Sequence, residues 1–122
     1  MNHILVVDDE ASIRDLLAEF FRKRGYKVST ASNPKEALSL TDSVPLNLVI
    51  LDVLLDDKDG MEVLEDIKEK HPNLPVIIMT GIGYDEELLK EARDKGAAGY
   101  LSKTLPLDQL LMEVHRILNH FK

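Results

Sequence analysis

The amino-acid sequence predicts an α/β protein in which a doubly wound parallel sheet carries helices on both faces. Short runs rich in valine and isoleucine alternate along the chain with segments whose apolar residues recur at helical spacing. This alternation favours parallel strands joined by right-handed helical crossovers. Sheets of this kind bind ligands at the carboxyl ends of their strands, so functional residues are expected at that edge.

Five segments of the chain are predicted to be strands. The first, third and fourth are almost continuously apolar, which indicates burial on both faces of the sheet. The predicted strands are residues 3–7, 27–31, 46–52, 75–80 and 98–102.

Five helices are predicted to alternate with the strands. The clearest follows the last strand, because its apolar residues from Leu107 to Phe121 recur at the i, i+3, i+4 and i+7 positions. The second helix has a marked start. Asn33 is the expected N-cap, Pro34 the first helical residue, and Glu36 the acid that reaches back to the cap.

The composition fits one soluble domain. With 122 residues, of which 44% are hydrophobic and 30% charged, the chain can bury one core, so residues 1–122 are expected to form a single domain. The net charge of −7 disfavours nucleic acid and anionic membranes as partners. The absence of cysteine excludes thiol catalysis, and the four histidines lack metal-ligand spacing and are expected on the surface. No apolar run is long enough for a signal peptide or a membrane span, so a cytoplasmic location is expected.

Polar residues stand at the carboxyl ends of four of the predicted strands, either as the last residue or just beyond it, and the parallel arrangement would bring them to one edge of the sheet. In strand order they are Asp8 with Asp9, then Asp52, Thr80 and Lys103. Carboxylates that lie close together are costly unless a cation neutralises them. Mg²⁺ prefers such oxygen ligands together with phosphate oxygens. The sequence therefore predicts a Mg²⁺ site that receives a phosphoryl group.

The same residues suit phosphoryl transfer. Lys103 offers a positive charge and Thr80 a hydroxyl donor to phosphoryl oxygens, while Gly81 leaves room beside the backbone. The carboxylate of Asp52 can itself be the nucleophile and form an aspartyl phosphate.

Four fragments, "VVDDE", "VILDVLLDDKDG", "VIIMTG" and "GAAGYLSK", occur in this order along the chain. Together they resemble the receiver domain of two-component response regulators. The resemblance implies a flavodoxin-like, five-stranded sheet in the order 2-1-3-4-5 with five helices on two faces. It also implies a histidine kinase or a phosphotransfer protein as phosphoryl donor. No effector domain is expected within the 122 residues, so the output would come from an unknown downstream protein or effector domain.

The resemblance assigns the metal site by position. Asp52 would be the phosphoacceptor. Asp9 and the backbone carbonyl of Leu54 would join Asp52 on Mg²⁺, with Asp8 acting mainly through water.

The resemblance also assigns the residues that contact the phosphoryl group and respond to it. Thr80 and Lys103 would contact the phosphoryl oxygens beside Gly81. Tyr100 matches the aromatic switch of the family, which turns inward as Thr80 moves toward the phosphate. The surface of the fourth helix, fifth strand and fifth helix would change in response, and a homodimer through this face is a further expectation.

Two departures from the family pattern stand beside the site. Thr104 follows Lys103 where the family usually has proline, so either a trans bond with a shifted loop or a strained cis bond is expected. Asp56 stands where the family commonly has proline. It either deepens the negative potential or lies in a solvated loop, and we favour the loop.

Leu54 and Ile82 occupy positions that help to admit the hydrolytic water in receiver domains. Both are aliphatic and cannot hold a water by a hydrogen bond, so we expect slow self-dephosphorylation.

The leading hypothesis is a signalling switch that assists its own phosphorylation but turns over no external substrate. One alternative is a phosphate-independent, receiver-like binding module, which Thr104 would favour. The other is a Mg²⁺-dependent phosphohydrolase that forms an aspartyl phosphate. It would need an acid/base residue where Leu54 stands and a cap domain, and the sequence supplies neither.

Overall fold

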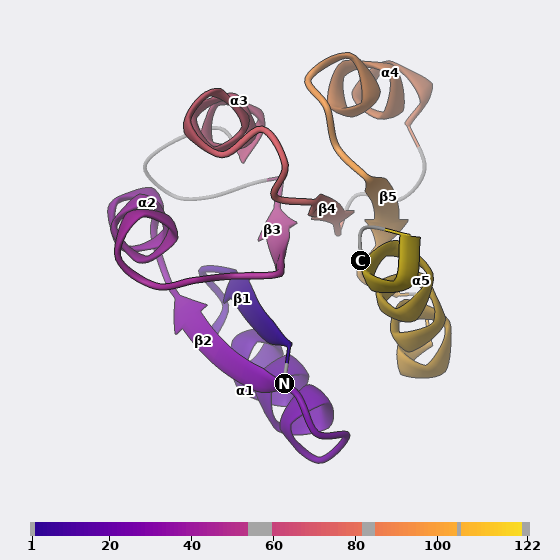
Figure 1. The fold of residues 1–122 in the computed structure, drawn as a ribbon. Helices are drawn as coiled ribbons and strands as arrows, with labels where there is room; N and C mark the ends of the chain where they lie inside the picture. The colour runs from indigo at the N-terminus through magenta and orange to yellow at the C-terminus, as the bar shows by residue number, and fades with distance from the viewer. Residues whose placement is uncertain (1, 54–59, 82–84, 105, 121–122) are drawn as a thin grey trace.

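The computed structural model describes residues 2–53, 60–81, 85–104 and 106–120. In this part of the chain, one parallel sheet has the strand order β2-β1-β3-β4-β5, which confirms the predicted flavodoxin-like fold (Figure 1). The strands are β1 (His3–Val7), β2 (Lys27–Ala31), β3 (Leu48–Asp52), β4 (Val76–Thr80) and β5 (Gly99–Ser102). The helices are α1 (Ala11–Arg22), α2 (Pro34–Ser43), α3 (Gly60–Lys70), α4 (Glu86–Asp94) and α5 (Leu107–His120).

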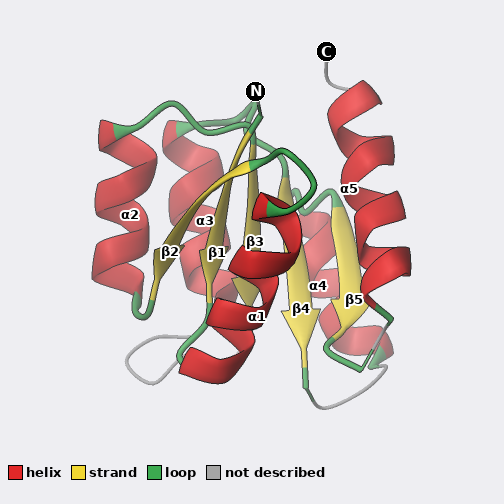
Figure 2. Cartoon of the chain, turned by 90° about the horizontal axis from the view of Figure 1, so that it is seen from below, coloured by secondary structure: helices red, strands yellow, loops and turns green. Residues whose placement is uncertain are grey.

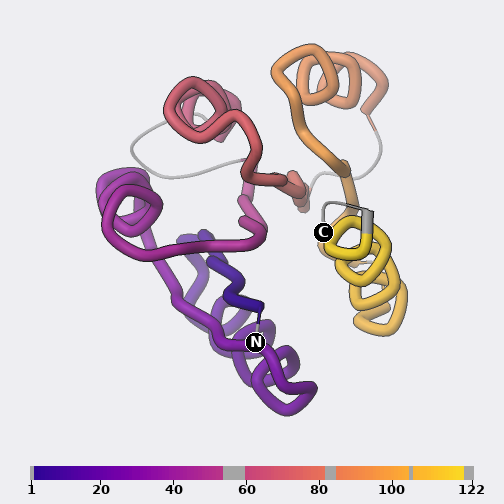
Figure 3. The backbone as a smooth tube through the Cα atoms, viewed as in Figure 1, coloured from indigo at the N-terminus to yellow at the C-terminus, as the bar shows by residue number. Residues whose placement is uncertain are grey.

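The helices form two layers on opposite faces of the sheet. Figure 2 shows α1 and α5 in front of the strands and α2, α3 and α4 behind them. The tube in Figure 3 shows the same grouping, with the N-terminal and C-terminal helices on one side. None of the described helices combines the length and the apolar character that a bilayer crossing requires.

The sheet divides the hydrophobic core into two clusters. Successive residues of a strand point to opposite faces, so Ile50 packs with the cluster under α1 and α5, and Leu51 with the cluster under α2, α3 and α4. Strands β1, β3 and β4 are buried along their whole length, as their apolar sequences predict. The tight packing of these three strands fixes the positions of their carboxyl ends.

The third strand begins at Leu48, two residues later than predicted. Asn47, immediately before it, bonds His3 twice: its backbone N–H donates to the carbonyl oxygen of His3, and its Oδ1 atom accepts the N–H of His3, each at 2.8 Å. The predicted start of α2 is confirmed. Asn33 Oδ1 accepts the N–H of Glu36 at 2.9 Å, and Pro34 is the first helical residue.

The histidines are distributed differently from the prediction. His115 is exposed as expected, whereas His3 is buried, and the side chain of His120 lies outside the described residues. The imidazole of His3 is satisfied on both sides. Its Nδ1 lies 3.1 Å from the carbonyl oxygen of Pro45, and its Nε2 lies 2.7 Å from Ser29 Oγ. Strand β1 lies between β2 and β3 and is buried at every residue, which explains why the expectation for His3 was wrong.

Candidate functional site

The carboxyl edge of the sheet brings together polar residues that are far apart in the sequence. Asp8 follows β1 directly, Asp52 is the last residue of β3, Thr80 is the last of β4, and Lys103 follows β5. All four strands run parallel, so these ends lie along the same edge. The structure therefore groups the residues as their positions in the sequence predict.

The ammonium group of Lys103 is the centre of this cluster. Its Nζ atom lies 2.9 Å from Asp52 Oδ2, 3.0 Å from Asp8 Oδ2 and 3.1 Å from Glu10 Oε1. The side chains of Asp8 and Asp52 are only 5% and 3% exposed, and that of Lys103 is 11% exposed. Two buried carboxylates thus share one cationic partner, which compensates part of their desolvation.

The environment also perturbs the titration of Lys103. Burial by itself lowers the pKa of the ammonium group, but the hydrogen bonds to Asp52, Asp8 and Glu10 together outweigh it and raise the pKa above its ordinary value. The lysine is therefore positively charged throughout the physiological range of pH.

Asp8 is held from several directions. Its Oδ1 atom accepts a hydrogen bond from the N–H of Glu10 at 2.9 Å. Its backbone carbonyl oxygen accepts one from Arg14 Nη1 at 2.7 Å. Its own N–H donates to the carbonyl of Ala31 at 3.1 Å. These contacts fix the turn between β1 and α1, so the carboxylate of Asp8 faces Lys103 with little freedom.

Three consecutive acids can hold a cation at this turn. Asp8, Asp9 and Glu10 each offer a carboxylate oxygen, and these oxygens lie within 4.8 Å of one another. An all-oxygen donor set of this charge suits a hard divalent ion such as Mg²⁺. Sequence reasoning did not assign a site role to Glu10, although its place in the acidic triplet could have suggested one.

Thr80 and Gly81 continue the edge beside Lys103. Thr80 is fully buried, and its carbonyl oxygen accepts the backbone N–H of Lys103 at 2.8 Å. A Cβ atom on Gly81 would lie 3.7 Å from Lys103 Cδ, which is an ordinary van der Waals distance. Contact with the lysine therefore does not itself require glycine, and the expected contact of Gly81 with a phosphoryl group stays a prediction.

Tyr100 lies on β5 with its ring directed into the molecule. The residue packs against the core cluster under α2, α3 and α4, and its hydroxyl oxygen is buried. Together with Leu89 and Arg93 it lines a hollow of about 150 Å³ between β5 and α4. The residue therefore lies between α4 and the strand that leads to Lys103, and its expected role as a switch stays a prediction.

The structure resolves the alternatives at Thr104. The Lys103–Thr104 bond is trans, as are all peptide bonds among the described residues. Thr104 donates its N–H to Ser102 Oγ at 3.1 Å, and the two hydroxyl oxygens lie 2.8 Å apart. Sequence reasoning did not identify Ser102 as part of the site.

Several predictions concern residues outside the described ranges. Leu54 with its metal-binding carbonyl, Asp56, and Ile82 all belong to this group. The expected roles of these residues in metal binding, local charge and dephosphorylation stay predictions.

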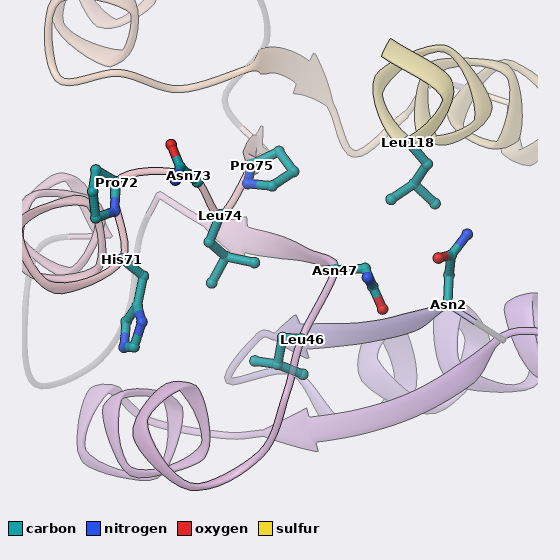
Figure 4. Close-up of a pocket in the computed structure, with 9 residues that line it drawn as sticks. All are labelled: Asn2, Leu46, Asn47, His71, Pro72, Asn73, Leu74, Pro75 and Leu118. Atoms are coloured by element: carbon teal, nitrogen blue, oxygen red, sulfur yellow. The ribbon is translucent and has the colours of Figure 1, made fainter. Parts of the chain in front are cut away.

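A pocket of about 420 Å³ lies at the opposite edge of the sheet (Figure 4). Asn2, Asn47 and Pro75 line it, and each directly precedes a strand, so the pocket belongs to the amino ends of the strands. None of the residues predicted to form the functional site lines this pocket.

Comparison with known proteins agrees with this geometry. Residues 4–115 match the response regulator receiver domain family. Sporulation initiation phosphotransferase F of Bacillus subtilis is 36% identical over 115 residues, which cover 94% of this chain and 92% of that protein. An NtrX-like response regulator of Rickettsia felis is also 36% identical over 115 residues, 93% of this chain, but the chain spans only 24% of that protein.

Solved structures give the same result. The CheY-like receiver domain protein of Methanospirillum hungatei JF-1 superimposes with a TM-score of 0.95 at 28% identity, covering 99% of this chain and 96% of that one. TrrA of Thermotoga maritima, solved in complex with Mg(2+)-BeF, has a TM-score of 0.87 at 35% identity and covers 96% of this chain and 99% of that one. The chain therefore belongs to the receiver domain family of two-component response regulators, whose members serve in phosphorylation-dependent signalling.

Proposed function

We propose that the protein is a signalling switch in which Asp52 accepts a phosphoryl group. The observation that carries the proposal is the pairing of Asp52 with Lys103 at 2.9 Å on the carboxyl edge of the sheet. A carboxylate oxygen of Asp52 attacks phosphorus as the bond between phosphorus and the donor breaks, which leaves an aspartyl phosphate. The donor is a histidine kinase or a phosphotransfer protein.

Lys103 and Thr80 stabilise the negative charge of the transferring group. The ammonium of Lys103 already lies beside the attacking carboxylate, so it needs little reorganisation to contact a phosphoryl oxygen. Thr80 ends the neighbouring strand and offers a hydroxyl from the same edge, beside Gly81. Phosphoryl transfer depends mostly on such positioning and charge neutralisation.

Asp8, Asp9 and Asp52, with the backbone carbonyl of Leu54, would hold Mg²⁺. Mg²⁺ supplies positive charge that neutralises the carboxylates and the phosphoryl oxygens. The clustered oxygens of Asp8, Asp9 and Glu10 support this assignment, as does the Mg(2+)-BeF complex of TrrA.

The output surface is the face formed by α4, β5 and α5, which also serves if the protein forms a homodimer. Met112 of α5 is 69% exposed and gives this face an apolar side chain. It lines a shallow hollow with Leu101, Gln109 and Glu113. Tyr100 joins this face to the site, so phosphorylation shifts the population between two arrangements of α4 and β5.

The proposal is tested by intact-mass measurement after incubation with acetyl phosphate and Mg²⁺. The wild type should gain one phosphoryl group. Asp52→Asn should gain none, and neither should the wild type in a chelator. Asp94→Asn, which changes an exposed aspartate of α4, is the matched control and should be labelled like the wild type. Equal labelling of Asp52→Asn would contradict the proposal. A folded, Mg²⁺-bound wild type that takes no label would favour a phosphate-independent binding module.

A further inference from the structure

We propose that Ser102 is a positioning residue for Lys103, because its hydroxyl closes a turn with Thr104 that directs the lysine toward Asp52. The inference deepens the proposed function and rests on it. It concerns the segment in which this chain departs from the usual lysine–proline sequence of receiver domains. The family relies on a proline ring at this point, whereas here a side-chain hydrogen bond shapes the backbone.

The backbone of Lys103 is held on both sides. On one side, its N–H donates to the carbonyl oxygen of Thr80 at 2.8 Å, which extends the pairing of β4 with β5. On the other side, Ser102 Oγ accepts the N–H of Thr104 at 3.1 Å and lies 2.8 Å from Thr104 Oγ1. A serine hydroxyl that bonds the backbone two residues further along mimics a backbone turn.

Thr104 can make this turn because it is not proline. A proline at this position would have no N–H to donate, so the bond to Ser102 could not form. The substitution therefore supplies a hydrogen-bond donor in place of a rigid ring. Because Thr104 is exposed, water competes for this bond, and we expect a moderate rather than a complete effect when it is lost.

The direction of Lys103 matters because its side chain is flexible. A lysine ammonium is a point charge on a four-carbon stem, and its place depends on where the backbone presents the stem. Here the ammonium must reach Asp52 and Asp8, both within 3.0 Å. If the backbone after Ser102 sampled several conformations, the ammonium group would lie near these carboxylates for a smaller fraction of the time.

Loosening Lys103 has two effects of opposite sign. Phosphorylation slows, because the lysine meets the phosphoryl oxygens less often. Mg²⁺ binding to the unphosphorylated protein tightens, because the ammonium and the cation compete for the carboxylates of Asp8 and Asp52. General damage to the fold would weaken both, so the pair of measurements separates positioning from a merely structural role.

The experiment compares Ser102→Ala with Ser102→Thr, which keeps the hydroxyl. Mg²⁺ affinity is measured by titration calorimetry, since the chain has no tryptophan to report binding. The phosphorylation rate is measured by mass spectrometry with acetyl phosphate. Loss of one neutral hydrogen bond predicts phosphorylation about threefold to fivefold slower for Ser102→Ala, with Mg²⁺ bound about twofold more tightly. Ser102→Thr should behave like the wild type in both.

A second variant, Thr104→Val, keeps the N–H but removes the hydroxyl, and it should give a smaller change of the same sign. An unchanged rate or weakened Mg²⁺ binding in Ser102→Ala would overturn the proposal. A wild type that takes no phosphoryl group would refute the proposed function instead. In that case the Mg²⁺ titration alone still decides whether Ser102 restrains Lys103.

Discussion

Replacing Lys103 with methionine is the sharpest perturbation of the site. The change keeps most of the apolar stem but removes the ammonium group that pairs with Asp52 and Asp8. Both carboxylates are nearly buried, so neither gains full hydration in compensation. We expect Lys103→Met to be less stable than the wild type without Mg²⁺ and to bind Mg²⁺ more tightly.

The size of the stability loss in Lys103→Met follows from the burial of Asp8 and Asp52. Removing one partner of a buried ion pair costs about 3–5 kcal/mol. Glu10 is exposed and adds little, and Asp8 keeps its hydrogen bond from the N–H of Glu10, so the lower end, about 3 kcal/mol, applies here. For a chain of this length, that loss lowers the unfolding temperature by roughly 10 °C. Mg²⁺ at about 100 times its Kd should restore roughly 2.7 kcal/mol.

The assay is thermal unfolding by circular dichroism, with and without Mg²⁺, together with calorimetric titration of Mg²⁺. Lys95→Met is the matched control, because Lys95 forms ion pairs with Glu65 and Glu91 away from the site. It should leave Mg²⁺ affinity unchanged. The reasoning is refuted if Lys103→Met unfolds at the wild-type temperature without Mg²⁺ and binds Mg²⁺ no more tightly.

Two further predictions test the surroundings of the site. A Cβ atom on Gly60 would lie 2.7 Å from Val53 Cα, so Gly60→Ala should cost up to about 3 kcal/mol in chemical denaturation, whereas Gly99→Ala, with ordinary contacts, should cost less. Hydrogen bonds from Ser32 lower the pKa of Glu36 below its ordinary value of 4.5, so the stability it contributes is present above that value and lost as the pH falls through the folded pKa. The unfolding temperature of the wild type should therefore fall more steeply below about pH 4.5 than that of Glu36→Gln. Parallel curves would contradict this.

The sequence predicts which strand ends form the site because two local signals coincide. The alternating periods locate the strands, and an acid, a hydroxyl or an amine at the ends of four of them indicates which edge of the sheet is functional. Parallel strands then bring Asp52, Thr80 and Lys103 together without any knowledge of side-chain geometry. The boundaries are less predictable, because β3 begins at Leu48, two residues after the start of the apolar run that predicts it.

The missed features depend on three-dimensional contacts. His3 has an unremarkable sequence context, yet it is buried because β1 lies inside the sheet, between β2 and β3. The carboxylate of Glu10 accepts a hydrogen bond from the ammonium group of Lys103, which lies 93 residues later in the sequence. The hydrogen bond between Ser102 and Thr104 depends on the local backbone after β5. The residue type at position 104 could not decide by itself between a cis and a trans peptide bond.

The most direct test of the phosphoacceptor is chemical trapping of the aspartyl phosphate. The protein is incubated with acetyl phosphate and Mg²⁺, reduced with borohydride, and digested for fragmentation mass spectrometry. Reduction converts a phosphorylated aspartate, but not a free one, to homoserine. We predict homoserine at position 52, dependent on both the donor and Mg²⁺. A labelled protein that yields homoserine at another aspartate, with Asp52 unchanged, would contradict the assignment of Asp52 as the phosphoacceptor.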